Sequence, residues 1–295
     1  GVIGIDTGLQ ALNDAIGGWH DTDFIVVQGR SGMGKTAFAL SLAKAAAGKD
    51  RVGIISTEMA TVQLAMRRIS QGSGVSMTDI RKGNLDDDKW AHIARTITSD
   101  VDTGLGKRIK INDTALELDD IKRQARAWKR EFGLNLLIVD YIQNVSVSNR
   151  RGISGDKVQE VMAVSRELKQ LAKRLKIPVI GLAQTKRDVD TRAGDKRPTT
   201  ADVMWASQIE QDADVMIAVY RHAKYFPQFG TYNGVKNIAE IITQKNRHGP
   251  VDTCYAVFLP DRMDFVDADD SGVSQYFAEL ATPPENQRKS AAKDW

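Results

Sequence analysis

The segment from Val26 to Phe38 constrains this chain more than any other part of it. It reads VVQGRSGMGKTAF, and Gly29, Gly34, Lys35 and Thr36 fit the spacing G-x-x-x-x-G-K-[ST]. In this pattern, glycines let backbone N–H groups turn toward phosphate oxygens, the lysine reaches the β- and γ-phosphates, and the threonine binds Mg²⁺. The sequence therefore predicts a site for ATP, or another nucleoside triphosphate, with Mg²⁺.

The surroundings of this segment argue against a chance glycine-rich turn. Phe24 to Gln28 is a short apolar run, and Lys35 to Ala47 is rich in helix formers, so a strand should lead through the turn into a helix. The positive end of that helix favours bound phosphate. The residues expected to contact the nucleotide are Gly29, Arg30, Ser31, Gly32, Met33, Gly34, Lys35, Thr36 and Phe38.

Composition sets further limits. With 295 residues, of which 42% are hydrophobic, we expect one main domain with an ordinary buried core. Lys and Arg number 41 against 38 Asp and Glu, so any grip on nucleic acid must come from local clusters of charge. The single Cys254 cannot form an internal disulfide, which is typical of a reducing cytosol. No apolar run has the length of a membrane crossing, and the first residues lack a signal-peptide pattern.

Apolar runs alternate with helical patterns along the chain. The expected buried strands are Phe24 to Gln28, Val52 to Ser56, Leu136 to Asp140, Pro178 to Leu182 and Val215 to Tyr220. Strands separated by helices predict an α/β fold with a mainly parallel central sheet flanked by helices. Ile238 to Thr243 and Thr253 to Leu259 predict an antiparallel hairpin that extends the sheet.

The polar segments divide the rest of the chain. Two connections, Asn144 to Lys157 and Thr185 to Thr200, are long and basic, which is typical of functional or disordered loops. We assign residues 1–270 to the domain and residues 271–295 to a C-terminal tail, because the end of the chain carries two prolines and little apolar content.

Two carboxylates follow predicted strands. Asp140 ends a buried strand, where an aspartate can support Mg²⁺ through a water, although an aspartate can also simply begin a turn. Glu58 follows the strand Val52 to Ser56 and is placed to deprotonate an attacking water. The same glutamate could instead cap the helix that follows, and spacing alone leaves both interpretations open.

Three further residues have weaker local signals. Gln184 ends a strand, where its amide could touch the γ-phosphate, but strand-end glutamines are more often solvated. Lys245 and Arg247 lie in the expected hairpin turn, too far along the sheet to serve their own nucleotide. They could act across a subunit boundary, as an arginine finger does, or they could be ordinary solvated turn residues, which local sequence favours.

Several segments occur in an order that resembles one family. They are GIDTGLQALNDAIGGW, GRSGMGKTAFAL, STEM, LLIVDYIQ, SRELKQLAKRLKIPVIGLAQ, DKRPTTADV, IEQDADVMIAVYR and IITQKNRHGP, between Gly4 and Val266. Together they resemble the C-terminal motor domain of the bacterial and phage replicative ring helicases, the DnaB type, within the RecA-like P-loop NTPases. The resemblance implies hexameric rings that thread single-stranded DNA through a pore and hydrolyse ATP at subunit interfaces.

The resemblance also implies roles for individual residues and partners. Lys35 and Thr36 match the phosphate and metal ligands, Glu58 matches the catalytic base, and Asp140 matches the Mg²⁺ support. Gln184 matches the γ-phosphate sensor, and Lys245 and Arg247 match the pair that acts on a neighbouring subunit. A primase, a helicase loader and a location in the cytoplasm of a bacterium or phage-infected cell are implied as well. The family's N-terminal domain and linker helix are expected to be absent from this chain.

The expected contacts to DNA come from the two basic loops and the segment after them. They are Arg150, Arg151, Lys186, Arg187, Arg192, Lys196, Arg197, Met204, Trp205 and Ala206. Family members commonly carry Arg-Glu-Ser-Gly where this chain has Met204 to Ser207, so these contacts depart from the family pattern. Trp205 could stack on a base or pack against the core.

Other functions share part of this pattern. A recombinase that coats DNA as a filament would also carry the P-loop and the glutamate. A nucleotide-gated module that holds single-stranded DNA without unwinding it is a second alternative, but such a module has no need of Glu58 as a base. The helicase segments therefore favour an ATP-driven DNA helicase motor.

Overall fold

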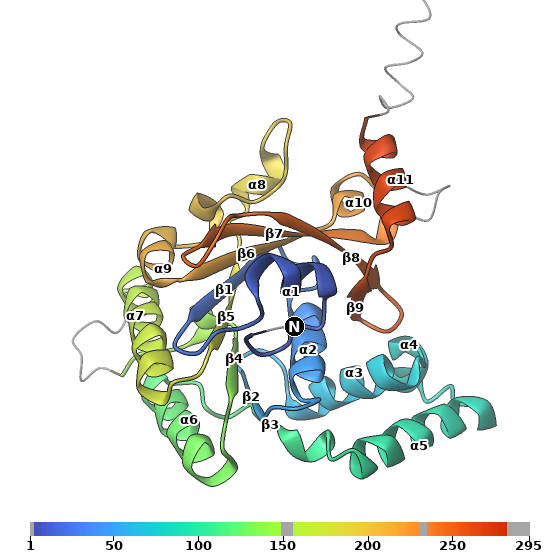
Figure 1. The fold of residues 1–295 in the computed structure, drawn as a ribbon, viewed down its shortest axis with the longest axis horizontal. Coiled ribbons are helices and arrows are strands. Elements are labelled where there is room, and N and C mark those ends of the chain that lie inside the picture. Colours follow the sequence, from blue (N-terminus) through green and yellow to red (C-terminus); the bar gives the residue numbers. More distant parts are fainter. Residues whose placement is uncertain (1–2, 149–155, 230–234, 282–295) are drawn as a thin grey trace, which may run out of the picture.

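A nine-stranded sheet organises the chain (Figure 1). The computed structural model describes residues 3–148, 156–229 and 235–281. The strand order is β3-β2-β4-β5-β1-β6-β7-β8-β9, in which the neighbours from β3 to β6 pair in parallel and those from β6 to β9 pair antiparallel. The prediction of a mainly parallel sheet with an antiparallel C-terminal extension is confirmed.

The strands lie close to where the apolar runs placed them. Their bounds are β1 Phe24–Gly29, β2 Val52–Ser56, β3 Ile109–Asn112, β4 Leu136–Asp140, β5 Val179–Gln184, β6 Val215–Tyr220, β7 Ile238–Asn246, β8 Thr253–Leu259 and β9 Asp264–Asp267. The strands β1, β2, β4 and β6 are buried along their whole length, as a parallel sheet covered on both faces requires. The sequence did not predict β3 and β9, which lie at the two edges of the sheet.

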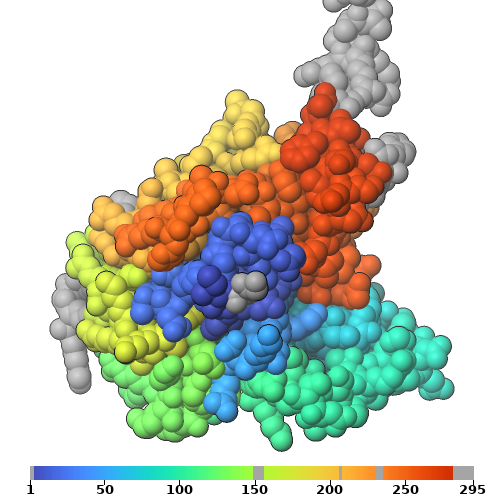
Figure 2. Space-filling model, in the orientation of Figure 1, coloured from blue at the N-terminus to red at the C-terminus, as the bar shows by residue number. Residues whose placement is uncertain are grey.

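Helices connect the strands and cover the sheet. Their bounds are α1 Gln10–Ile16, α2 Lys35–Ala46, α3 Thr61–Ser73, α4 Met77–Lys82, α5 Asp87–Asp102, α6 Leu118–Phe132, α7 Lys157–Leu175, α8 Asp188–Thr191, α9 Ala206–Asp212, α10 His222–Tyr225 and α11 Asp270–Leu280. In the space-filling view α3 to α5 form a lobe beside the body of the molecule (Figure 2). No helix in the described part of the chain is both long enough and apolar enough to cross a membrane.

The sheet is buried between two helical layers. Side chains of β1 alternate, so that Ile25 and Val27 pack with α1 and α2, whereas Phe24 and Val26 pack with α6 and α7. This arrangement follows from the connections, because helices that link parallel strands must lie on the faces of the sheet. It leaves the carboxyl ends of the parallel strands free to form a site.

Close packing of α6 on β2 depends on a glycine. A Cβ atom added at Gly53 would lie 2.5 Å from Cε3 of Trp128 and 2.9 Å from Cδ1 of Leu134. The indole of α6 therefore occupies the space that any side chain at residue 53 would need.

The C-terminal region differs from the expectation. Residues 270–280 form α11, although the sequence analysis assigned residues from 271 onward to a tail. Tyr276 of α11 is fully buried, and its hydroxyl donates to Oε1 of Glu240 at 2.5 Å. Local apolar content did not reveal this helix, because its anchor is a contact with a strand far away in the sequence. Residues 282–295 of the expected tail lie outside the described residues.

Candidate active site

The phosphate-binding turn lies between β1 and α2, as the motif predicts. Gly34 is the N-cap of α2 with φ 100°, and Gly32 has φ 79°. These left-handed conformations favour glycine and turn successive amides to one side. Helix α2 begins at Lys35, so its positive end faces the same space.

Lys35 is held by the turn itself. Its Nζ donates to the carbonyl oxygen of Gly29 at 2.7 Å. Burial lowers the pKa of Lys35 to about 8, and the nearby carboxylates of Asp140 and Glu58 offset only part of this effect. A bound triphosphate would supply negative charge where the buried ammonium now finds mainly carbonyl oxygens.

Thr36 and Asp140 meet across the sheet edge. Thr36 Oγ1 donates to Oδ2 of Asp140 at 2.7 Å. Asp140 ends β4 and is buried, and burial raises the pKa of its carboxyl group. Hydroxyl and carboxylate oxygens are ligands that Mg²⁺ prefers, and it commonly keeps several waters beside them. The two side chains therefore fit Mg²⁺.

One cavity brings the predicted catalytic residues of a single copy together. Its volume is about 400 Å³, and its walls are Ser31, Gly32, Gly34, Lys35, Thr36, Ala37, Glu58, Met59, Arg67, Asp140, Tyr141, Gln184, Arg221, Phe258 and Met263. Ser56 pairs with Asp140 in the sheet, so the exposed Glu58 follows β2 close to the aspartate. Gln184 ends β5, where its backbone N–H donates to Oε1 of Gln143 at 3.2 Å.

Seven residues that line this cavity were not predicted from the sequence, among them Arg67, Arg221 and Phe258. Arg67 comes from α3, and burial lowers its pKa while Asp140 and Glu58 favour its charged form. Arg221 follows β6, and its guanidinium carbon lies 4.0 Å from the ring centroid of Phe258 in β8. Arg221 had one available signal, since it stands directly after a buried parallel strand, as Asp140 ends one. Phe258 had none, because it reaches the cavity from the antiparallel extension.

Four residues of the expected nucleotide-binding segment do not line the cavity. Phe38 is fully buried in the core beneath α2, and Met33 is 2% exposed. Gly29 contributes a carbonyl oxygen to Lys35 rather than a cavity wall. The guanidinium of Arg30 turns away to Asp190, with distances of 2.5 to 3.0 Å to the carboxylate.

Lys245 and Arg247 lie beside the amino-terminal ends of the parallel strands, whereas the cavity lies at their carboxyl ends. Asn246 pairs with Val215, and Val215 pairs with Ile25, so the β7–β8 turn lies beside the start of β1. The phosphate turn follows the end of β1, six residues or about 20 Å further along the strand. Within one copy, therefore, these two cations do not join the cavity.

Lys245 and Arg247 both form hydrogen bonds with backbone carbonyl oxygens of their own chain. Lys245 Nζ donates to the carbonyl oxygen of Glu210 at 2.5 Å, and Arg247 donates to that of Gln211 at 2.7 Å. These carbonyls belong to the last turn of α9, where a helix attracts cations. Arg247 also lies 3.2 Å from Oδ1 of the buried Asp214, which accepts from Lys169 as well.

Comparison with known proteins agrees with this architecture. The DnaB-like helicase C-terminal domain family matches residues 4–267. The chain belongs to this family. A replicative DNA helicase named DnaC from Bacillus subtilis (strain 168) is 37% identical over 279 residues, covering 92% of this chain and 59% of the relative. A replicative DNA helicase named DnaB from Geobacillus stearothermophilus is 36% identical over 286 residues, covering 96% and 60%.

Solved structures share the fold. A DnaB-like replicative helicase, described together with its interactions with primase, superposes with a TM-score of 0.82 at 29% identity, covering 91% of this chain and 62% of its own. A second solved structure, described as an ATPase domain, gives a TM-score of 0.81 at 29% identity, covering 91% and 92%. The RecA-like fold expected from the resemblance is thereby confirmed. The chain spans about three-fifths of the length of the curated relatives that it matches.

The residues expected to contact DNA fall into different environments. Most loop cations are bound within the chain: Lys186 donates to Ala201, Arg192 pairs with Asp202, Lys196 donates to Asp190, and Arg197 pairs with Glu240. Arg187 is exposed, and no side-chain partner is found for it among the described residues. Trp205 is partly buried and packs against the core on the α7 side. Met204 N donates to Gln184 O, Ala206 begins α9, and Arg150 and Arg151 lie outside the described residues.

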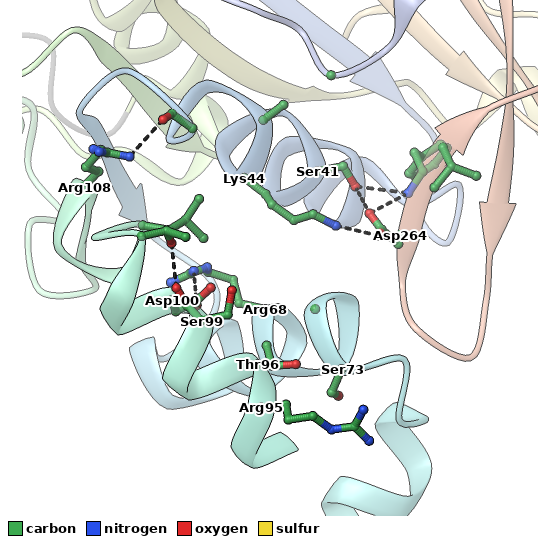
Figure 3. A pocket seen from close by; sticks show the side chains of 18 of the residues that line it. Ser41, Lys44, Arg68, Ser73, Arg95, Thr96, Ser99, Asp100, Arg108 and Asp264 are labelled. Carbon is green, nitrogen blue, oxygen red and sulfur yellow. Dashed lines mark hydrogen bonds and ion pairs between the residues drawn. The ribbon is translucent and has the colours of Figure 1, made fainter. Parts of the chain in front are cut away.

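A larger hollow lies elsewhere. Its volume is about 1010 Å³, and it lies between α2, α3, α5 and β9 (Figure 3). Two of the cations that line it form ion pairs within the chain: Lys44 with Asp264 at 3.1 Å and Arg68 with Asp100 at 2.9 Å. None of the predicted catalytic residues reaches it. Cavity volume alone therefore does not single out the candidate active site.

Proposed function

We propose that this chain is the motor domain of a replicative DNA helicase, which hydrolyses ATP between the subunits of a ring, expected to be a hexamer, and moves along single-stranded DNA. Membership of the DnaB-like family supports this proposal. The observation that supports it most is the distance, within one copy, between the cavity and the two expected catalytic cations. The cavity lies at the carboxyl ends of the parallel strands, and the two expected catalytic cations lie beside their amino-terminal ends.

The cavity can supply most of the chemistry. Lys35 neutralises charge on the β- and γ-phosphates, and Glu58 orients and deprotonates the attacking water. Gln184 contacts the γ-phosphate at the end of β5. Thr36 and Asp140 would hold Mg²⁺, which would neutralise charge on the phosphate oxygens. The guanidinium of Arg221, which lies over the buried ring of Phe258 in the cavity wall, offers a flat cationic surface to the nucleobase.

The missing chemistry comes from a neighbouring copy. Phosphoryl transfer needs positive charge on the side of the transferring group that faces away from its own P-loop, which an arginine finger supplies. Lys245 and Arg247 of an adjacent subunit are proposed to fill this role. In the structure the exposed fraction of the Arg247 side chain is 48%, so it is accessible to a partner while it remains anchored to Asp214.

The remaining partners follow from the same proposal. Single-stranded DNA binds through charge on its phosphates, with Arg187 as the accessible cation of the loop after β5. A primase is a proposed partner because the structural neighbour was described with its interactions with primase. A helicase loader is proposed from the family resemblance alone.

Mixing two inactive variants tests the shared site. In Lys35→Ala the chain loses its own phosphate-binding cation but keeps the hairpin turn, and in Arg247→Ala the reverse holds. We expect either variant alone to lose about 10³-fold in DNA-stimulated ATP turnover, and the mixture to recover a measurable fraction. Recovery arises only where an intact cavity meets an intact turn from the other copy.

The control mixture replaces Arg247→Ala by a chain that carries both changes. It contains no intact cavity, so its turnover should stay at background. If the mixture of single variants also stays at background, although both chains bind single-stranded DNA and assemble, the shared site is refuted. Strand displacement of a forked duplex by the unmodified chain then separates a helicase from a binding module.

A further inference from the structure

Arg30 joins the phosphate turn to the basic loop that follows β5. Its Nε and Nη2 donate to both carboxylate oxygens of Asp190, and Nη1 donates to the carbonyl oxygen of Thr185 at 3.1 Å. The exposed fraction of the Arg30 side chain is 13%, whereas that of Asp190 is 39%. A guanidinium held by two carboxylate oxygens has a fixed orientation as well as a fixed distance.

A third element completes this contact. The hydroxyl of Tyr225 in α10 donates to Oδ1 of Asp190 at 2.9 Å. The Lys224 side chain of the same helix lies within 3.2 Å of the position that a Cβ of Gly32 would occupy. The phosphate turn is therefore in contact with α10 and, through Arg30, with α8.

Asp190 also organises the basic loop around it. Lys196 Nζ donates to the carbonyl oxygen of Asp190 at 2.8 Å and also to that of Arg192. Arg187 precedes α8, and its carbonyl oxygen accepts from Asp190 N at 2.8 Å. Any displacement of Asp190 therefore moves the exposed cation at the start of this helix.

We propose that Asp190 is a positioning residue which, through its bidentate contact with Arg30, makes nucleotide binding and single-stranded DNA binding dependent on each other within one subunit. This inference rests on the proposed function, because it requires that the loop after β5 binds DNA. A triphosphate in the turn fixes the backbone of Arg30, and the ion pair transmits that position to α8 and its cations. Gln184 reaches the cavity from the end of β5, so its proposed role as a phosphate sensor does not depend on the contact between Arg30 and Asp190.

The thermodynamic consequence is a reciprocal effect. If bound nucleotide changes the affinity for DNA by some factor, bound DNA must change the affinity for nucleotide by the same factor. Such factors are commonly about 5 to 150. A purely structural role of Asp190 would instead weaken DNA binding equally with and without nucleotide, and it would leave the ratio unchanged.

The test compares two aspartates of one short helix. Asp190 forms an ion pair with Arg30, whereas the side chain of Asp188 is exposed and forms no ion pair with Arg30. The dissociation constant of a fluorescent oligothymidylate is measured with and without a non-hydrolysable ATP analogue, and that of the analogue with and without oligothymidylate. We expect the dissociation constants measured with and without the second ligand to differ at least fivefold in the unmodified chain and in Asp188→Ala. Their ratio should be near one in Asp190→Ala.

A conservative variant and a fold measurement complete the design. Asp190→Glu keeps a carboxylate for Arg30 and should recover part of the ratio, while thermal unfolding checks that Asp190→Ala is folded at the assay temperature. A ratio that persists in Asp190→Ala, or disappears equally in Asp188→Ala, overturns the role of Asp190. If the unmodified chain does not bind oligothymidylate, the proposed function itself fails. If it binds but shows no ratio, only the inference fails.

Discussion

Burial and charge act against each other on the side chain of Lys35. The proposed contact with phosphate requires a charged ammonium, but burial in the cavity wall removes water from the lysine and favours its neutral form. The carbonyl oxygen of Gly29 holds it in place without supplying a full negative charge. The lysine is therefore prepared for a ligand that brings the missing charge.

This balance predicts how nucleotide binding depends on pH. The pKa of Lys35 is about 8 before phosphate binds, and phosphate raises it, so binding above pH 8 must take up a proton. Affinity for a non-hydrolysable ATP analogue should be greatest well below pH 8, where Lys35 is already charged, and should fall about tenfold between pH 7.5 and 9, as measured by calorimetry. Lys35→Arg should remove the dependence, because a guanidinium stays charged. Lys44→Ala, on the other side of α2, should retain it.

Arg197 and Arg187 should separate stability from DNA binding. Arg197 donates to both oxygens of Glu240 at 2.6 Å, and Glu240 is 2% exposed. Arg197→Ala leaves that carboxylate without its cation and should lower the free energy of unfolding by about 2 kcal/mol, measured by denaturant titration. Arg187→Ala should leave stability unchanged and weaken oligonucleotide binding, most strongly at low salt. If Arg197→Ala and Arg187→Ala lost the same DNA affinity and had the same free energy of unfolding, this assignment would be contradicted.

Backbone position predicted Lys35, Thr36 and Asp140 of the cavity, whereas Glu58 was assigned through the family resemblance. Asp140 lies at a strand end, and Lys35 and Thr36 begin a helix after a glycine turn. The direction in which a long side chain points depends on partners that are distant in the sequence. Arg30 belongs to the same turn but points to Asp190, 160 residues away, and no local pattern records that partner.

At the scale of elements, burial determines what the sequence reveals. The fully buried strands were predicted within one or two residues, because they must be apolar on both faces. The edge strand β3 has a single buried residue, Ile109, and so has no such signal. Helix α11 was missed for a similar reason, since Tyr276 is its only fully buried anchor among the described residues.

The contact between α6 and β2 predicts a loss of stability on adding one methyl group. Gly53→Ala would place Cβ at 2.5 Å from the indole of Trp128, and the packed core leaves no room for the ring to move. The free energy of unfolding should fall by about 1 to 3 kcal/mol, measured by thermal or denaturant unfolding. Gly106→Ala is the matched control, because its nearest neighbour would be 3.8 Å away. Similar losses in both variants would show that packing against Trp128 is not the cause.

At the scale of the whole molecule, the proposed division of the site between two copies would link nucleotide binding to assembly. A ligand held by two copies must favour their association, by the same factor that association improves its binding. Sedimentation or mass photometry should therefore find larger assemblies with the ATP analogue and oligonucleotide than without them. Arg247→Ala should reduce this difference while analogue binding to single copies persists. Assemblies of identical mass under all conditions would contradict the prediction.

The cavity and the hairpin turn lie at opposite ends of the parallel strands, and this also bears on the symmetry of an assembly that shares its sites. In a pair related by a twofold axis the same surface patch of each copy faces the other, so that single patch would have to hold both the cavity and the hairpin turn. A head-to-tail arrangement instead joins two different patches, so every copy lends its turn on one side and borrows from another copy on the other side. Successive copies then all point the same way around the assembly, and this shared orientation gives a bound strand two distinguishable directions of travel.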